Sequence, residues 1–268
     1  MSARLPGAAA AAAAAAVMTT HELGVRAGER LLVENLGLAV AAGEFIAVLG
    51  RNGSGKSLTL HTLAGLRAPA AGQIELAGTN LARHSRRAIA QRLAFLPQDR
   101  EDSLPLSPHE AALLARHPQL GWWQRESASD LGAVNAALQR FGLADCAHRT
   151  LLTLSGGEQR RAAMAATLAQ QPQIFLLDEP TNHLDPHHQV DVLLAFRERC
   201  AGGAAVIATL HDPALAERCA DRVLLLYGDG RWQLGRTAEL LNAAELTELY
   251  QTPMTELAGG GRRAFIPA

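Results

Sequence analysis

One stretch decides the fold of this 268-residue chain: Gly50-Arg51-Asn52-Gly53-Ser54-Gly55-Lys56-Ser57. It matches the pattern G-x-x-x-x-G-K-S/T, follows the apolar run 45–49 and precedes a segment whose helical character begins at Lys56. A strand, a glycine-rich loop and a helix in this order form a cradle for phosphate, because successive backbone N–H groups point at its oxygens beside a helix N-terminus. The stretch therefore predicts a phosphate-binding site in an α/β fold.

The side chains of the cradle have separate predicted roles. The glycines permit backbone angles and a close approach that a larger residue would block. Lys56 can reach the β- and γ-phosphates, and the Ser57 hydroxyl can ligate Mg²⁺. A glycine-rich turn that matches by chance is the alternative, but it does not explain why Lys56 is the sole lysine among 25 lysines and arginines. The residues expected to bind nucleotide here are Gly50, Asn52, Gly53, Ser54, Gly55, Lys56 and Ser57.

A second apolar run, residues 174–177, delivers the adjacent carboxylates Asp178 and Glu179. They are expected at the carboxyl end of a buried strand, where ligands of open α/β folds bind. Asp178 would orient Mg²⁺ or its water, and Glu179 would act on the attacking water as a general base. Alone, this pattern is also compatible with an ordinary strand end. Together with the cradle it predicts nucleotide hydrolysis.

The rest of the chain divides into segments of different residue composition. The runs 174–177, 205–210 and 223–227 are almost entirely apolar and are separated by helical segments, which predicts a parallel sheet covered on both faces. Residues from about 99 to 170 carry prolines, a tryptophan pair and amphipathic runs, and we expect a helical insertion there.

The two ends of the chain read as tails. Residues 1–20, with the alanine run 8–17, predict a low-complexity disordered tail; a weak signal peptide is the alternative, and Met18 is an alternative start. A helical stretch is expected over 237–250, and residues 259–268 are expected to form a short C-terminal tail. A single domain over 21–258 is the result.

Composition excludes several classes of protein. With 48% hydrophobic and 19% charged residues the chain can bury a core, which argues against disorder as its main state. A formal charge of −1 and a pI near 6.8 give no general attraction to nucleic acid. No run approaches the roughly 20 apolar residues of a membrane-spanning helix. The widely spaced Cys146, Cys200 and Cys219 predict neither a disulfide framework nor a zinc site, and favour a reducing compartment.

Residues 154–159 read Leu-Ser-Gly-Gly-Glu-Gln and lie between the cradle and the carboxylates. They predict a helix N-terminus at which Ser155, Gly156 and Gly157 present a hydroxyl and backbone donors to an anion. An ordinary N-cap explains the serine and leaves the double glycine unexplained. The stretch resembles the LSGGQ-type signature of ABC transporter ATP-binding subunits, and the resemblance runs over nearly the whole chain from residue 23. It implies a P-loop NTPase core with a mostly parallel sheet, an N-terminal antiparallel β portion and an inserted helical subdomain.

The resemblance extends to three further motifs. The run 95–98 resembles the Q-loop, so that Gln98 would contact Mg²⁺ or water. The run 182–185 resembles the D-loop with Asp185, and the run 210–212 resembles the switch that brings His211 to the γ-phosphate. It thus implies Glu179, His211 and Gln98 as catalytic residues and Ser57, Gln98 and Asp178 as ligands of Mg²⁺.

Two features depart from the family or offer another interpretation. Ala27 stands where the family usually has a tyrosine that stacks on adenine, so that either Arg26 covers the base as a flat cation or base contact is weak. His183, His187 and His188 suggest metal binding, but a solvated loop face is the interpretation we favour.

The resemblance implies an assembly as well as an activity. The chain would be an ATPase that uses ATP and Mg²⁺, forming a homodimer in which each nucleotide lies between Lys56 of one copy and Ser155 and Gly157 of the other. Two integral membrane permease subunits and a periplasmic or surface substrate-binding protein would complete it at the cytoplasmic face of the inner membrane, without nucleic acid. Residues 99–125, with Trp122 and Trp123 as anchors, would receive the permease; packing within the helical subdomain is the alternative for the tryptophans.

The stretch 168–189 and the closing helix 240–250 resemble the importer ATPases for iron–siderophore, haem and cobalamin complexes. They imply uptake of a metal chelate, with ferric siderophore and cobalamin ahead of haem. Alternatives are an ATPase for haem export in cytochrome maturation and a non-transport ABC ATPase acting on DNA or ribosomes. A simple P-loop kinase would leave residues 155–158 without a purpose.

Overall fold

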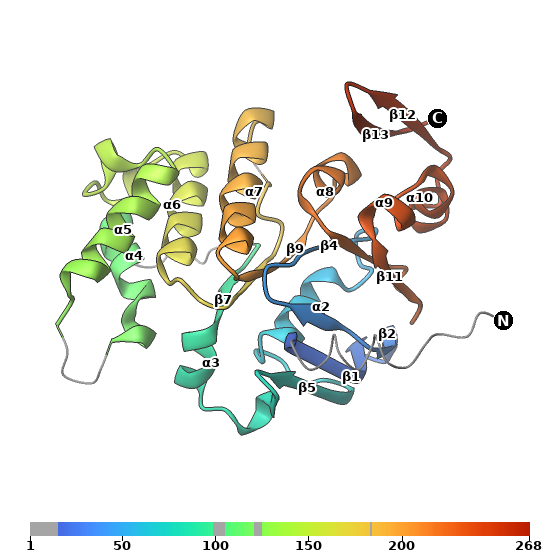
Figure 1. Cartoon of the computed structure of the whole chain (residues 1–268), viewed down its shortest axis with the longest axis horizontal. Helices are drawn as coiled ribbons and strands as arrows, with labels where there is room; N and C mark the ends of the chain where they lie inside the picture. Colours follow the sequence, from blue (N-terminus) through green and yellow to red (C-terminus); the bar gives the residue numbers. More distant parts are fainter. Residues whose placement is uncertain (1–15, 99–104, 121–124, 183) are drawn as a thin grey trace.

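A six-stranded sheet lies at the centre of the protein (Figure 1). The computed structural model describes residues 16–98, 105–120, 125–182 and 184–268. All neighbouring strands of the sheet are parallel except for the edge pair β10 and β11. The apolar runs predicted to form a parallel sheet do form it, and the predicted α/β class is confirmed. In spatial order the strands are β11 (Trp232–Arg236), β10 (Arg222–Leu226), β4 (Phe45–Leu49), β9 (Ala205–Thr209), β8 (Ile174–Leu177) and β7 (Leu93–Leu96).

Both faces of this sheet are buried. Along β4, Phe45, Ala47 and Leu49 belong to a hydrophobic cluster shared with the helices of one face, whereas Ile46 and Val48 belong to a second cluster on the other. Burial of both faces explains why the strand is apolar at every position rather than at alternate ones. Helices on the first face include α7 (Pro186–Ala201) and α8 (Pro213–Cys219), and α2 (Lys56–Leu63) packs in the second cluster.

A smaller antiparallel sheet covers the second face. Its path runs β2 (Arg30–Leu36), β1 (Ala16–Ala27), β5 (Ala71–Leu76) and β6 (Thr79–Asn80), with β3 (Ala39–Ala41) also paired to β1. The predicted tail ending at residue 20 is therefore wrong for residues 16–20. Met18 and Thr20, which are two residues apart and so lie on the same face of the strand, are both buried, and Met18 pairs with Leu76 of β5. Residues 1–15 lie outside the described part of the chain.

Helices fill the segment between β7 and β8, where the sequence predicted an insertion. The helices α4, α5 and α6 begin with serine capping boxes, in which the N-cap hydroxyl and an acidic side chain three residues later satisfy orphan backbone donors. A buried ion pair between Arg116 and Asp130, at 2.6 Å, ties α4 to α5. The elements are α4 (Pro108–Ala115), η2 (His117–Gln119), α5 (Ala128–Arg140), η3 (Ala144–Cys146), η4 (Leu151–Thr153) and α6 (Gly156–Ala169); η1 (Leu81–Arg83) and α3 (Arg86–Arg92) precede β7.

The C-terminus forms a hairpin rather than the predicted tail. The helices α9 (Thr237–Leu240) and α10 (Ala243–Tyr250) lead to β12 (Met254–Gly259) and β13 (Arg262–Pro267). Gly260 and Gly261 both have positive φ, as a two-residue hairpin turn requires. Arg263 binds the Glu217 carboxylate of α8 at 2.7 and 2.9 Å, and Phe265 is buried. No helix in the described ranges combines the length and apolar character that crossing a membrane requires.

Candidate functional site

The glycine-rich loop turns tightly between β4 and α2. A Cβ on Gly50 would lie 2.5 Å from both the Leu226 carbonyl oxygen and Ser54 Oγ, so no larger residue fits there. Gly55, the N-cap of α2, has φ 101°, and a Cβ on it would approach Leu32 to 3.0 Å. The loop thus needs glycine at both positions, as the sequence predicted for a phosphate cradle.

Lys56 lies at the start of α2 and is only 5% exposed. Its Nζ donates hydrogen bonds to the carbonyl oxygens of Gly50 (2.8 Å) and Arg51 (3.3 Å). Burial lowers the pKa of Lys56, while the nearby charges of Glu179 and Asp178 act in the opposite direction. The ammonium group is therefore partly desolvated and held within the loop. Its electrostatic attraction to a bound anion is stronger there than it would be in water.

Ser57 and Asp178 meet although they lie far apart in the sequence. Ser57 Oγ donates a hydrogen bond of 3.1 Å to Asp178 Oδ1. Thr209 Oγ1 donates a second one, at 2.7 Å, to the same oxygen and accepts a third, at 2.7 Å, from the Glu179 backbone N–H. A hydroxyl and a carboxylate side by side are the hard oxygen ligands that Mg²⁺ takes in phosphate sites, so these residues fit the predicted cation. The role of Thr209 was missed; the available signal was a hydroxyl at the end of an otherwise apolar strand.

Both the backbone and the side chain of Glu179 are constrained. Its φ is 46°, a left-handed conformation that is rare outside glycine. Its Oε1 lies 2.6 Å from His211 Nε2, and its Oε2 accepts a hydrogen bond from the Asn182 side-chain amide. The Glu179 side chain is 7% exposed and the His211 side chain 42%. The predicted base and the predicted switch histidine are thus in direct contact, and Asn182, to which no separate role was assigned, is a third member of the group.

One cavity of about 520 Å³ unites most of the predicted residues. Its lining combines the loop after β4 with the ends of β7, β8 and β9. Ala27 and Leu32 contribute apolar surface from the N-terminal strands, so that the position at which a tyrosine was expected does border the cavity. The predicted site residues that line it are Asn52, Gly53, Gly55, Lys56, Ser57, Gln98, Glu179 and His211.

The predicted signature does not line this cavity. Ser155 is exposed at the N-cap of α6, where its Oγ donates to Glu158 Oε2 at 2.7 Å. Hydrogen bonds from the Ser155 hydroxyl and the Ser155 backbone N–H to the Glu158 carboxylate lower the pKa of Glu158. A Cβ on Gly156 would meet no described atom within 4 Å, and one on Gly157 would meet only Arg161 at 3.8 Å among the described atoms. Nothing within the described protomer therefore demands glycine here, and the open helix end faces outward.

Asp185 also lies outside the cavity lining, as do the predicted residues Gly50, Ser54 and Asp178. It caps α7 by accepting from the His188 backbone N–H at 3.1 Å, and its Oδ2 lies 2.6 Å from His188 Nδ1. The hydrogen bonds with His188 lower the Asp185 pKa. His183 falls outside the described residues, as do Trp122 and Trp123. In the described ranges no group of three or more histidine, cysteine, aspartate or glutamate side chains could hold a metal ion.

Known proteins resemble this chain over most of its length. The family model described as ABC transporter matches residues 33–182. A hemin import ATP-binding protein of Bradyrhizobium diazoefficiens is 38% identical over 88% of this chain and 88% of its own. An achromobactin transport ATP-binding protein of Dickeya dadantii is 36% identical over 87% of each. A solved metal-chelate type ABC transporter in an inward-facing conformation has a TM-score of 0.80 and 26% identity, covering 94% of this chain and 98% of that one.

Proposed function

This chain belongs to the ABC transporter family of ATP-binding proteins and is an ATPase, and on that premise we propose that it powers the import of a metal-chelate cargo through a partner permease. The cargo class is a ferric siderophore, haem or cobalamin. Support comes from the resemblance to relatives named for hemin import and achromobactin transport, and from the likeness to a metal-chelate type transporter. The contact of Glu179 with His211 beside the buried Lys56 is the observation that carries the hydrolytic part of the proposal.

We propose tasks for several groups in and beside the cavity. Lys56 binds the phosphates and exchanges its present carbonyl partners for their oxygens. Ser57 and Asp178 would hold Mg²⁺, with Gln98 at the edge of the cavity; the bound ion would offset the charge of the phosphate oxygens. Glu179 takes the proton of the attacking water at its carboxylate.

The contacts of the carboxylate explain how it is oriented. His211 and Asn182 hold its two oxygens from different sides, and Thr209 fixes the backbone N–H of the same residue. A base fixed in this way has little freedom to rotate away from the water it must deprotonate.

The open end of α6 supports a homodimer closed by nucleotide. Ser155, Gly156 and Gly157 lie outside the cavity of their own protomer, yet the helix end they form suits an anion. In the proposed dimer this end completes the cavity of the other copy, so that each ATP contacts Lys56 of one protomer and Ser155 of its partner. Glycine is then required by the approach of the partner and not by the protomer itself.

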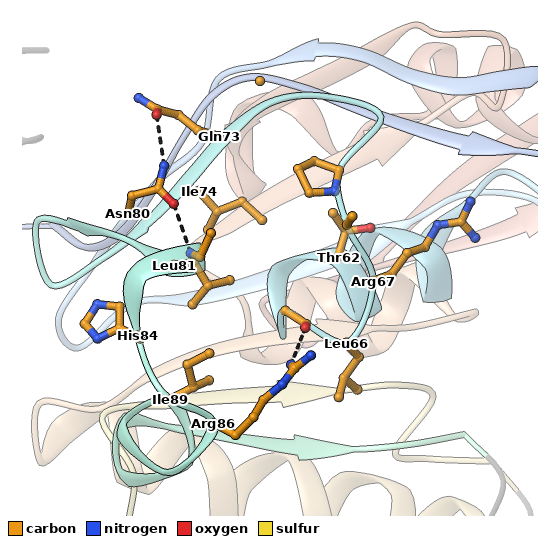
Figure 2. A pocket seen from close by; sticks show the side chains of 15 residues that line it. Thr62, Leu66, Arg67, Gln73, Ile74, Asn80, Leu81, His84, Arg86 and Ile89 are labelled. Atoms are coloured by element: carbon orange, nitrogen blue, oxygen red, sulfur yellow. Dashed lines mark hydrogen bonds between the residues drawn. The ribbon is translucent and has the colours of Figure 1, made fainter.

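A groove beside the helical insertion suits the permease. We define the docking groove as two adjoining cavities of about 430 and 290 Å³ that share Leu66, Arg86 and Ile89. Figure 2 shows the larger one, in which Arg86 reaches from α3 to the Gly65 carbonyl while Leu66 points into the space below α2. Two large apolar side chains that line the smaller cavity are exposed: Leu66 at 59% and Leu114 at 57%.

The position of the docking groove links it to the nucleotide site. Its floor includes Leu93 and Phe95 of β7, the strand that leads directly to Gln98. A permease helix seated there would press on the strand that positions Gln98 at the edge of the nucleotide cavity. Pro118 and Leu114 belong to the segment 99–125 predicted to receive the permease, and the proposed groove extends that surface to α2 and α3.

A transport assay tests this function. The chain, copurified with its permease and reconstituted in vesicles, should drive ATP-dependent uptake of radiolabelled haem, ferric siderophore or cobalamin when a substrate-binding protein delivers it from the opposite side. The same vesicles carrying Glu179→Gln should show none. ATP-dependent uptake of none of the three cargoes, or recovery of the chain with ribosomes or DNA in place of membrane proteins, would overturn the proposal. Copurification with the permease would also place the chain at the membrane.

A further inference from the structure

A buried arginine joins the helix that begins at Ser155 to two ends of the central sheet. Arg160 lies on α6, roughly one and a half turns after that N-cap, and is 8% exposed. Its Nη1 donates to the carbonyl oxygens of Pro97 (2.7 Å) and Gln98 (2.9 Å). Its Nη2 donates to those of Asp178 (3.0 Å) and Glu179 (2.8 Å).

These four carbonyl groups stand at the ends of neighbouring strands. Pro97 and Gln98 follow β7, and Asp178 and Glu179 follow β8, which pairs with β7 in parallel. A planar guanidinium presents donors in a fixed fork, so it can hold two chain segments at a set spacing. Lysine has one nitrogen at the end of a flexible stem and cannot fix two segments in this way.

The bond to Glu179 acts on its strained backbone. At φ 46° this residue keeps its conformation only because its surroundings hold it, and the direction of its side chain depends on that conformation. Thr209 binds its N–H and Arg160 binds its carbonyl oxygen, so that both sides of the residue are fixed.

We propose that Arg160 is a positioning residue for ATP hydrolysis: it sets the backbone of Glu179 and of Gln98 from the same helix that begins at Ser155. This inference rests on the proposed ATPase mechanism and adds a residue that does not line the nucleotide cavity. It also gives a direct route between the helix end offered to the partner's nucleotide and the general base of the protomer's own site.

The test compares steady-state ATP hydrolysis by the full chain and by Arg160→Gln and Arg160→Lys. Loss of alignment should lower kcat of Arg160→Gln by about 10- to 100-fold, while KM and the Kd for ATP, which depend on the cradle, change by less than about threefold. Arg160→Lys should recover only a small part of kcat, because it restores the charge without the fork.

Arg116→Gln is the matched control. Arg116 is similarly buried and donates to the Ala169 carbonyl at the other end of α6, at 2.8 Å, and neither residue lines the nucleotide cavity. Both glutamine variants should have a lowered melting temperature, but only the change at Arg160 should lower kcat. Wild-type kcat in folded Arg160→Gln, full recovery in Arg160→Lys, or an equal kcat loss in Arg116→Gln would overturn the inference. Absence of ATP hydrolysis by the wild-type chain would instead contradict the proposed mechanism itself.

Discussion

The His211 imidazole lies 2.6 Å from the carboxylate of Glu179, at the ends of two adjacent parallel strands. Asn182 holds the other carboxylate oxygen, and the buried Lys56 borders the same cavity. A carboxylate held on both oxygens and placed beside a phosphate cradle is suited to remove a proton from water.

Replacing Glu179 by glutamine should separate binding from hydrolysis. Removal of the general base is expected to lower kcat by about a hundredfold or more, whereas ATP binding through Lys56 stays intact. Phosphate release and isothermal titration measure the two properties. Glu217→Gln, which alters a carboxylate on α8 bound to Arg263, should leave kcat unchanged. Normal turnover in Glu179→Gln would remove Glu179 as the base.

Loss of the Lys56 charge should weaken ATP binding. Lys56→Met keeps an aliphatic side chain but removes a charge-assisted contact with phosphate, so the Kd for ATP should rise by about 10- to 100-fold. Binding should also depend on pH. Because burial lowers the Lys56 pKa, the ammonium loses its proton at a lower pH than an exposed lysine would, and the wild-type Kd should rise with pH in the alkaline range.

Titration calorimetry of both proteins across the alkaline range measures this dependence. The Kd of Lys56→Met should be flat where that of the wild type rises. An unchanged Kd in Lys56→Met at neutral pH is the result that contradicts the assignment of the cradle.

Thr209→Val should damage both stability and catalysis. The fully buried Thr209 hydroxyl bridges the Asp178 carboxylate and the Glu179 N–H. Valine has the same shape but no hydroxyl, so both groups lose this hydrogen bond. The free energy of unfolding should fall by about 1 to 3 kcal/mol, and kcat should fall with it. Denaturant titration and steady-state kinetics measure the two effects. Thr167→Val, which removes a buried hydroxyl bonded to its own helix at Ala163, is the control and should retain kcat. Equal kcat values for the two variants would refute the bridging role.

A methyl group at Gly157 should block dimerisation without harming the fold. Within the protomer its nearest described neighbour would be Arg161, at 3.8 Å, so Gly157→Ala is expected to keep the melting temperature. In the proposed dimer the same methyl group meets the partner's nucleotide. Light scattering with saturating ATP, in the Glu179→Gln background, should therefore show dimers for the parent and monomers for the double variant. Gly132→Ala, on an exposed helix position with open space around it, should dimerise like the parent. Dimers formed equally well with Gly157→Ala would rule out the shared site.

Most of the correct predictions came from short patterns in the sequence. The cradle, the buried strands and the carboxylates after β8 each depend on residues close together in the sequence, so periodicity and glycine spacing were enough to find them. Thr209 and Arg160 were missed because their partners lie on other strands, and no local pattern states which side chains a sheet will bring together. Arg160 donates to backbone carbonyl groups, and one of the two partners of Thr209 is a backbone N–H; backbone groups have no residue type that a sequence pattern could recognise.

The predicted boundaries of the two terminal tails were wrong for a different reason. The alanine run hid the start of β1, since alternation over residues 16–20 is too short to stand out from it, and its burial depends on pairing with β5 far along the chain. At the other end, the prediction of a short C-terminal tail over residues 259–268 was wrong, because two glycines between short alternating runs also suit a hairpin turn. In the structure Arg263 of this hairpin forms an ion pair with Glu217 of α8, a long-range contact that the local sequence does not indicate.

The nucleotide cavity and the docking groove have no described lining residue in common. In the proposed assembly, substitutions of groove residues outside β7, such as Leu66 and Leu114, can alter the contact with the permease without replacing a residue that lines the nucleotide cavity. A different membrane partner could then be accommodated at this surface while the residues that line the nucleotide cavity stay the same.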